Sequence, residues 1–423
     1  MRTPSIPLCL PVAAFLLQCN VMLARENHPP DRTVSQTGTV SFKLHVDKTY
    51  RNGRKAPTVS QQLFELPGFA ECVFRCNESS VLLFWWWAQN KHDRSFRIGL
   101  PELPGPATYF LQFSWDTARG RSDGYMNGIS LRIPGTTFEP WWFERKATKA
   151  SLSEAGPLRV TDLNVSDKYT PPVEAKAAVP DDLRGRHAGL HGFSLPPDPV
   201  DVAARRGDLL YSSLMDRPES VREWVAEGPL RTRYEGGHML MRSANFANNI
   251  VFWCPRDFPA DFVAEWEFKP LSEHGLAIVF FAARGEQGED IFDPSLAPRN
   301  GDFGGYIHGD IVSYHISYFA HLPTYQTGRI CSNMRKNNQF YKVAGGPVAV
   351  PPRSKGWQHI RLVKDGNHIQ LSANGRISVD WTDDNPERYG PPHGGGKIGL
   401  RQMSPTIGSY RNFRVWALRD GSN

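Results

Sequence analysis

The sequence predicts an all-β protein built of two tandem antiparallel jelly-roll sandwiches joined by a proline-rich linker. Three observations support this fold class. Short apolar runs alternate with turn signals, the 423 residues include 37 glycines and 34 prolines, and no helix-period segment is longer than about ten residues. Chains of many short strands with frequent turns fold as sandwiches or jelly rolls. A composition of 40% apolar and 22% charged residues is globular and excludes collagen, coiled-coil and disordered chains.

Residues 1–24 are typical of a secretory signal. Arg2 precedes a short apolar stretch, which a proline and two polar residues interrupt, so the stretch is poorly suited to spanning a bilayer. Gln18 stands before Cys19, where a lipoprotein signal needs a small residue, and this disfavours a lipid anchor. No later segment is long and apolar enough to cross a membrane. We therefore expect a secreted or periplasmic protein with no membrane span.

Residues 38–165 form the first predicted sandwich. Residues 39–46 alternate polar and apolar side chains with period two, as a half-buried strand does. Residues 81–87 are continuously apolar, which suits a strand covered on both faces. Asn127-Gly128 is a dipeptide that favours a tight hairpin turn.

Residues 166–207 change character, because six prolines occur there without any sustained period. This composition predicts a linker or an irregular crossover, stiffer than a glycine-rich one.

Residues 208–418 form the second predicted sandwich. Its turns include Asp365-Gly366 and Asn374-Gly375, which connect a predicted meander. The expected strands cover residues 263–268, 276–283, 357–363, 369–373, 377–381, 398–402 and 410–418.

A series of ordered motifs runs through this second unit. They are Phe252-Trp253-Cys254-Pro255, residues 265–272, 280–285, 293–299, 380–384 and 395–403. Together these motifs resemble the YesU-like family, a domain of unknown function. The resemblance implies a concanavalin A-like or galectin-like sandwich, and some members lie among genes for pectic polysaccharide breakdown. The family provides no catalytic residues to carry over. Residues 38–165 resemble laminin-G-like sandwiches more loosely, through Trp115-Asp116 and Tyr125-x-Asn127-Gly128.

The segment 308–318 is the densest polar and aromatic stretch of the second unit. If it is a strand, Ser313, His315 and Ser317 share one face and Tyr314 and Tyr318 share the other. We expect the first face to line an open, polar groove that binds sugar hydroxyl or carboxylate groups. The predicted ligand-binding residues are His308, Asp310, Tyr318, Arg329, Asn333, Arg335 and Lys336, with Trp253 and Trp381 as further stacking rings. The alternative is that the histidines satisfy buried backbone groups and that the basic residues lie on a solvated loop.

Three residues are candidate catalytic groups. Glu265 and Glu267 lie two apart on a predicted strand and face the same side, at a spacing near that of paired glycosidase carboxylates. The alternative is that they lie on an ordinary exposed strand face. His315, together with Tyr318 and Arg335, offers the residue types of a lyase that removes a proton beside a uronic carboxylate.

No cofactor is expected, because no Cys-x-x-Cys or calcium-loop spacing occurs. A structural calcium ion is the alternative, with oxygen ligands from Asp290, Asp293, Asp302, Asp383 and Asp384. The net charge of +6 is too small and too scattered to indicate a nucleic-acid partner.

These patterns favour an exported carbohydrate-binding protein that takes part in the recognition or breakdown of an extracellular polysaccharide, and the family resemblance adds an acidic, pectin-like polysaccharide as one candidate. The expected partner is an oligosaccharide or polysaccharide. Two alternatives stay open. One is a glycoside hydrolase or polysaccharide lyase with its site in the C-terminal sandwich, and the other is a non-catalytic structural or adhesive surface protein.

Overall fold

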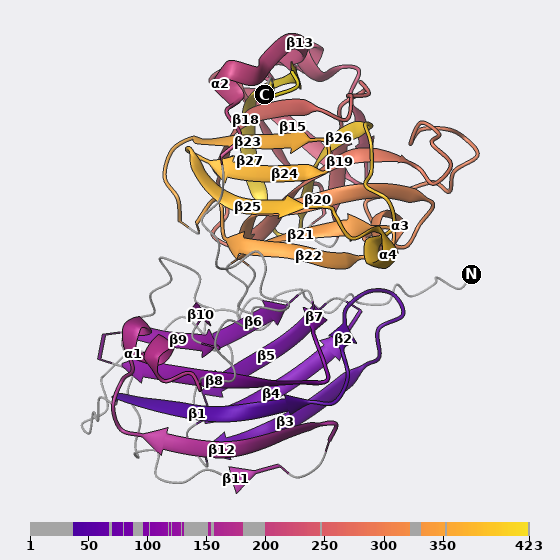
Figure 1. The fold of residues 1–423 in the computed structure, drawn as a ribbon. Helices are drawn as coiled ribbons and strands as arrows, with labels where there is room; N and C mark the ends of the chain where they lie inside the picture. Colours follow the sequence, from indigo (N-terminus) through magenta and orange to yellow (C-terminus); the bar gives the residue numbers. More distant parts are fainter. Residues whose placement is uncertain are drawn as a thin grey trace, which may run out of the picture.

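The computed structural model shows two β-sandwiches, one from each half of the chain (Figure 1). The described residues are 37–421, without 67–69, 79, 88–95, 101, 117, 120, 128, 131–150, 154–155, 181–198, 246–247, 322–330 and 352. The predicted signal segment therefore lies outside the described residues. The all-β architecture confirms the predicted fold class.

The N-terminal sandwich has two five-stranded sheets, in the orders β10-β9-β8-β1-β12 and β11-β3-β4-β5-β6, and a short β2-β7 pair. Its core lies between the sheets and includes Phe42, Phe64 and Phe74. The predicted alternation in β1 is confirmed, since Val40, Phe42 and every second residue onward are buried. The strands are β1 (Thr37–Val46), β2 (Tyr50–Arg51), β3 (Val59–Leu66), β4 (Ala70–Asn77), β5 (Ser80–Trp87), β6 (Phe96–Leu100), β7 (Glu102–Leu103), β8 (Ala107–Asp116), β9 (Arg121–Met126), β10 (Ile129–Ser130), β11 (Ser151–Leu152) and β12 (Leu158–Ser166).

Both ends of the predicted linker contain regular structure. Helix α1 (Pro172–Ala177) follows β12, and its Ala175 is fully buried. Helix α2 (Val202–Arg205) begins after Asp201, whose carboxylate accepts a hydrogen bond from the Ala204 amide, as a helix cap does. Strand β13 starts directly after α2. Of the predicted linker, residues 181–198 lie outside the described part of the chain.

The C-terminal sandwich has an eight-stranded sheet, β15-β16-β27-β18-β23-β24-β25 with β13 beside β27, and a seven-stranded sheet, β14-β17-β26-β19-β20-β21-β22. The strands are β13 (Arg206–Ser213), β14 (Val225–Glu227), β15 (Leu230–Glu235), β16 (His238–Ser243), β17 (Ile250–Trp253), β18 (Phe262–Pro270), β19 (Gly275–Gly285), β20 (Ile311–His321), β21 (Cys331–Asn337), β22 (Tyr341–Pro347), β23 (Gln358–Asp365), β24 (His368–Ala373), β25 (Arg376–Thr382), β26 (Lys397–Met403) and β27 (Ile407–Leu418), with short helices α3 (Gly304–Ile307) and α4 (Pro386–Tyr389).

The main core of this sandwich lies between the two sheets. From β18, Trp266 and Phe268 point inward and contact Tyr318 of β20, with ring centroids 5.5 and 5.3 Å apart. Because side chains alternate along a strand, Glu265 and Glu267 point out of the eight-stranded sheet. By the same alternation, His315 points out of the seven-stranded sheet. The sandwich therefore has two outer faces, each carrying residues that the sequence singled out.

The two predicted hairpin turns of the meander are present. Ala373 pairs with Arg376 across a turn whose central residues, Asn374 and Gly375, have φ values of 49° and 77°. Positive φ at both central positions is what a type I′ hairpin turn requires, and Asn-Gly tolerates it best.

The two sandwiches contact each other directly. The buried Asn52 side chain donates to the Lys342 carbonyl (3.3 Å) and accepts from the Lys342 amide (2.6 Å), as a neighbouring strand would. Arg388 is paired with Glu102 at 2.6 Å. These contacts join the loop after β2 and strand β7 to the β22 and α4 side of the C-terminal sandwich. Among the described residues, no helix is long and apolar enough to cross a membrane.

Candidate functional site

The outer face of the seven-stranded sheet is covered by the chain itself. The segment between β19 and β20 lies over this face and buries Ile291, Tyr306 and Ile307 against Trp253 and Phe280. The Phe280 and Tyr306 ring centroids are 5.5 Å apart. This second apolar layer occupies the place where the sequence predicted an open groove.

His315 is enclosed in this layer. Its side chain is 3% exposed, and its ring centroid lies 5.2 Å from Phe280, 6.2 Å from Phe303 and 6.1 Å from Phe340. Its Nδ1 is 3.0 Å from the Asn337 amide nitrogen. The prediction that Ser313, His315 and Ser317 line an open groove is therefore wrong. The alternation was read correctly, but aromatic side chains from elsewhere in the chain cover the outward face.

The polar residues predicted beside His315 have structural partners. Asp310 accepts a hydrogen bond from the Ala297 amide at 2.6 Å and so fixes the covering segment. The Arg335 guanidinium lies 3.7 Å over the Phe340 ring and donates to the Phe340 carbonyl at 2.9 Å. His308 is half-buried, with its Nε2 3.5 Å from a Glu78 carboxylate oxygen of the N-terminal sandwich. Each of these three side chains therefore contacts another part of the chain.

The other predicted binding residues are scattered. Asn333 is buried, and its backbone N–H donates to the Ser317 hydroxyl at 3.0 Å. Lys336 points to the opposite side of β21, where it pairs with Asp383 at 2.6 Å. Burial lowers the pKa of the Lys336 ammonium, and the Asp383 carboxylate opposes that shift. Arg329 lies outside the described residues.

Two of the three predicted stacking rings, Trp253 and Tyr318, are fully buried, and the third, Trp381, packs against the main core. Tyr318 is in the main core, with its hydroxyl 3.2 Å from that of Tyr410. Trp253 is fully buried and donates its indole N–H to Glu227 at 2.8 Å. Trp381 is half-buried, with its ring centroid 6.2 Å from that of Tyr389.

The outer face of the eight-stranded sheet is different, because charged residues from four neighbouring strands, β13, β27, β18 and β23, meet there at a partly exposed surface. We call this surface the arginine face. In the pairing of β18 with β23, Arg361 lies opposite Glu265 and His359 lies opposite Glu267. In the pairing of β18 with β27, Arg411 lies opposite Glu267. The arginine face consists of Arg206, Glu265, Glu267, His359, Arg361 and Arg411.

Glu265 is the centre of one half of this face. One carboxylate oxygen accepts from Arg206 at 2.6 Å and from Arg361 at 2.7 Å, and the other lies 3.4 Å from His359 Nε2. Burial raises the pKa of Glu265, but hydrogen bonds from His359 and Arg361 and the positive charges of Arg361 and Arg206 outweigh it and lower the pKa to about 2. Glu265 is therefore a permanent anion at neutral pH.

Glu267 is the centre of the other half. Arg411 donates to both of its carboxylate oxygens at 2.9 Å, and this bidentate bond is the main cause of its lowered pKa. Glu265 and Glu267 do face the same side, as predicted. However, a glycosidase needs one carboxyl group with a raised pKa to protonate the leaving group. Since both pKa values are lowered, the pair has no proton donor in this arrangement.

Two tryptophans border the arginine face. The Arg206 guanidinium lies 4.1 Å over the Trp416 ring, and the Arg411 guanidinium lies 4.2 Å over the Trp357 ring. Both rings are half-buried. The arginine side chains remain accessible, with exposed fractions of 33% for Arg206, 36% for Arg361 and 33% for Arg411. Planar cations and aromatic rings thus lie together on one solvent-facing surface.

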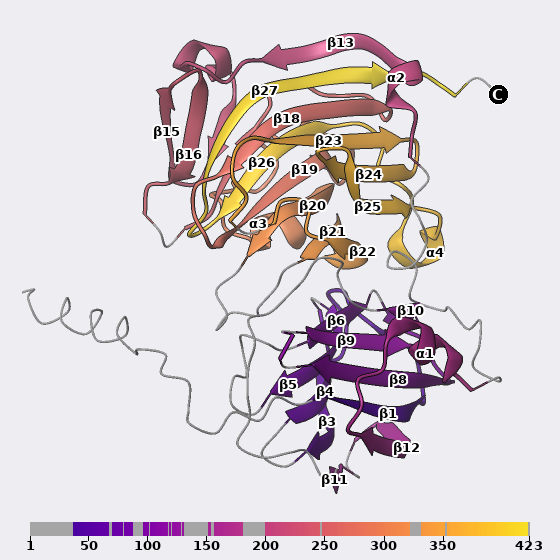
Figure 2. The same cartoon turned by 90° about the vertical axis from the view of Figure 1, so that its left-hand side faces the viewer.

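An open depression adjoins this face. It has a volume of about 650 Å³ and is bordered on one side by Arg206 and Arg361. Its other wall is the segment leading into α2, which lies at one end of the eight-stranded sheet (Figure 2). The complete lining is Pro199, Val200, Asp201, Val202, Ala203, Arg206 and Arg361.

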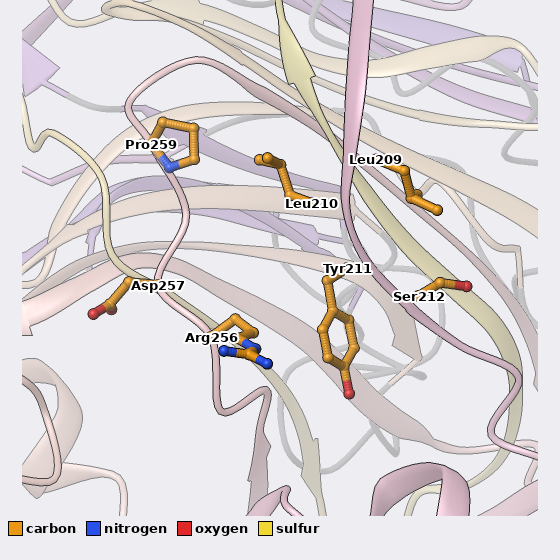
Figure 3. Close-up of a pocket in the computed structure, with 7 residues that line it drawn as sticks. All are labelled: Leu209, Leu210, Tyr211, Ser212, Arg256, Asp257 and Pro259. Carbon is orange, nitrogen blue, oxygen red and sulfur yellow. The ribbon is translucent and has the colours of Figure 1, made fainter.

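A second depression, of about 450 Å³, lies between β13 and the loop after β17 (Figure 3). Its lining is Leu209, Leu210, Tyr211, Ser212, Arg256, Asp257 and Pro259. The Tyr211 hydroxyl accepts the indole N–H of Trp224 at 2.8 Å. Leu209 and Leu210 are exposed, and the one acidic group, Asp257, is 3.4 Å from Lys397.

Sequence reasoning found the two glutamates of the arginine face but missed its three arginines. Arg361 and His359 share a parity on a predicted strand, and this was a usable signal. Arg206 was assigned to the linker, and only the register of β27 and β23 beside β18 brings the arginines to the glutamates. Four of the five aspartates considered as calcium ligands, Asp290, Asp293, Asp302 and Asp383, bind groups of the protein, such as Lys397 for Asp290 at 2.8 Å. Among the described residues, no cluster of three or more metal-ligating side chains occurs.

Comparison with known proteins places the similarity in the C-terminal half. Residues 208–415 match a family model described as a domain of unknown function, DUF1961. The uncharacterized protein YesU of Bacillus subtilis (strain 168) is 35% identical over 213 residues, which are 50% of this chain and 96% of YesU.

Among solved structures, a Bacillus subtilis protein of unknown function with a galectin-like fold is 34% identical, with a TM-score of 0.49 over 51% of this chain and 99% of that one. The carbohydrate-binding module CBM66 of Bacillus subtilis is 13% identical, with a TM-score of 0.31 over 46% of this chain and 96% of that one. The exoplasmic/lumenal domain of VIP36, in a Ca²⁺- and mannose-bound form, is 12% identical, with a TM-score of 0.37 over 51% of this chain and 94% of that one.

Proposed function

We propose, from the premise that this chain belongs to the DUF1961 family through its C-terminal sandwich, that it is an exported protein that binds a polysaccharide on the arginine face. The supporting observation is the set of three accessible guanidinium groups and two tryptophan rings on one open sheet face. Pyranose rings stack on aromatic side chains through their C–H faces, and guanidinium forks bind hydroxyl and carboxylate oxygens. Export is inferred from the signal-like residues 1–24.

The charge of the face favours an acidic ligand. Arg206, Arg361 and Arg411 carry three positive charges, while Glu265 and Glu267 carry two negative ones. Each glutamate is already paired, so the excess charge belongs to the arginines. A pectin-like polysaccharide, with a carboxylate on each sugar, is an acidic class that this surface would attract.

The test is a binding assay of the full chain against a panel of neutral and acidic glycans. Arg361→Ala and Trp357→Ala should each lower the affinity for the best ligand at least about tenfold, as expected for a lost charged hydrogen bond or ring contact. Arg353→Ala is a matched control, because Arg353 is a surface arginine paired with Glu273 away from this face. The proposal fails if no glycan binds, or if the control and the face variants bind alike.

A second candidate is a non-catalytic structural or adhesive surface protein. The covered face of the seven-stranded sheet favours it, because the groove predicted there is filled by the chain's own side chains. The same glycan panel separates the two functions. An adhesive protein without sugar recognition would attach to a surface while binding no isolated glycan.

A further inference from the structure

We infer that the depression beside α2 is a terminal subsite, which selects oligosaccharides that end in a hexuronate. This inference rests on the proposed saccharide binding and specifies which end of the ligand is recognised. It depends on three features: unused donors on two arginines, an apolar wall opposite them, and a closed end of the sheet face.

The two arginines of the depression have N–H groups that donate no hydrogen bond within the described part of the chain. Arg206 and Arg361 each donate one hydrogen bond to the same oxygen of Glu265. Apart from Glu265 and the Trp416 ring, neither guanidinium has another partner within the described part of the chain. A guanidinium has five N–H donors in a planar fork, and two forks sharing one carboxylate leave a net positive charge. A ligand carboxylate can therefore bind both arginines without breaking their bonds to Glu265.

The opposite wall is apolar. Pro199, Val200, Val202 and Ala203 line the depression across from the arginines. A sugar ring with a carboxylate at one edge matches this pairing, because its C–H face can contact the wall while its acid group meets the guanidinium groups. The carboxylate of Asp201 is exposed at the rim and already caps α2, so solvent screens its repulsion of a ligand anion.

The sheet face is closed beyond this point. Val263 follows the same outward row of β18 as Glu265, and Val363 the same outward row of β23 as Arg361. Both are buried in one cluster with Val202 of α2 and Leu418. Helix α2 therefore covers the end of the face, as its position in Figure 2 shows. A glycan can extend from the depression toward Trp357, about 13 Å away for four extended residues, but not past α2.

This geometry predicts recognition of a chain end. The terminal sugar occupies the depression, its carboxylate lies on Arg206 and Arg361, and the following sugars pass over Glu265 and Glu267. An internal sugar of a long polymer would have to continue through α2 and is excluded. Selectivity should therefore depend on the acid group of the last residue and not on the length of the chain.

The experiment is calorimetric titration of the full chain with trigalacturonate, with the matching neutral trigalactoside, and with long polygalacturonate. We expect trigalacturonate to bind at least about tenfold more tightly than the neutral trisaccharide. Each polygalacturonate molecule should bind one protein molecule, whatever the length of the polymer. Equal affinity for the two trisaccharides, or uptake of protein in proportion to polymer length, would overturn the inference while leaving saccharide binding intact. If the protein bound none of these three ligands and no other glycan of the panel, the proposed function itself would be wrong.

Two kinds of variant locate the effect. Arg361→Ala should abolish the preference for the acidic trisaccharide, whereas Arg353→Ala should preserve it. Ala203→Trp adds a large side chain at an exposed position of α2 and leaves both arginines in place. This variant should block binding of both trisaccharides while circular dichroism shows an intact fold. If Ala203→Trp folds and still binds trigalacturonate with the original affinity, the depression is not the subsite.

Discussion

The two outer faces of the C-terminal sandwich carry similar residue types, but one face is covered by other side chains and the other is accessible to solvent. On the seven-stranded sheet, His315 is enclosed by the rings of Phe280, Phe303 and Phe340, and Arg335 lies against Phe340. On the eight-stranded sheet, Arg361 and Glu267 stay accessible to solvent. The comparison teaches that alternation along a strand decides which way a side chain points, while distant parts of the chain decide whether anything can reach it.

The largest expected difference between the faces is in stability. Trp253→Ala on the covered face should lower the free energy of unfolding by about 3–5 kcal/mol, because it opens a cavity and removes a donor to the buried Glu227. Trp357→Ala on the open face should cost less, about 1–2 kcal/mol, since its ring is only partly buried. Denaturant unfolding of both variants measures the difference. Equal losses would mean that the two faces are not distinguished by burial.

Ligand binding should show the reverse ranking. Arg361→Ala should weaken glycan binding by about 10- to 100-fold, the value of one or two hydrogen bonds to a charged group. Arg335→Ala should leave the affinity of the folded protein unchanged, since that guanidinium is buried against Phe340. Titration of both variants with the tightest-binding glycan of the panel measures the two affinities and shows which face holds the site. If only Arg335→Ala lowered the glycan affinity, the binding site would lie on the seven-stranded sheet.

The open face should also contribute a component of acid unfolding. The pKa of Glu265 is about 2 in the folded protein against 4.5 for an ordinary glutamate. A lowered carboxyl pKa stabilises the fold fully above pH 4.5, and this contribution is lost as the pH falls from 4.5 toward 2. In the Glu265→Gln variant, the free energy of unfolding should therefore decrease less between pH 4.5 and pH 2 than in the unmodified protein. The difference should be no more than about 3 kcal/mol in total. An unchanged slope in a pH series of unfolding curves would contradict the pairing of Glu265.

The smallest effect is expected at Glu267. Its bidentate bond to Arg411 lies on a partly exposed surface, where ion pairs contribute about 1 kcal/mol or less. Glu267→Gln should therefore change stability little. If the protein released reducing ends from a glycan and Glu267→Gln abolished the release, the glycosidase alternative would replace simple binding.

Much of the fold could be predicted from the sequence. Period-two alternation predicted β1, and Asn374-Gly375 marked a hairpin whose positive φ values follow from those two residues. Local patterns also placed Glu265 and Glu267 on one side of β18. In each case the information lies within a few consecutive residues, where backbone sterics and alternation act directly.

The site could not be predicted in the same way. Arg206 reaches Glu265 because β13 pairs with β27, which pairs with β18, and this order depends on contacts across the whole domain. Much of the apolar layer on this face comes from the segment between β19 and β20, which has no sustained helix or strand period in its sequence, so its apolar residues gave no sign of which face they would cover. The predicted groove failed for this reason, although the parity on which it was based was correct.

Hydrogen–deuterium exchange of the full chain, with and without a saturating glycan ligand, tests the location of the site most directly. The ligand should slow exchange in residues 199–206 and in β23, and leave β20 and β21 unchanged. Slower exchange in β20 and β21, with β23 and residues 199–206 unaffected, would show that the sugar binds on the other side of the sandwich.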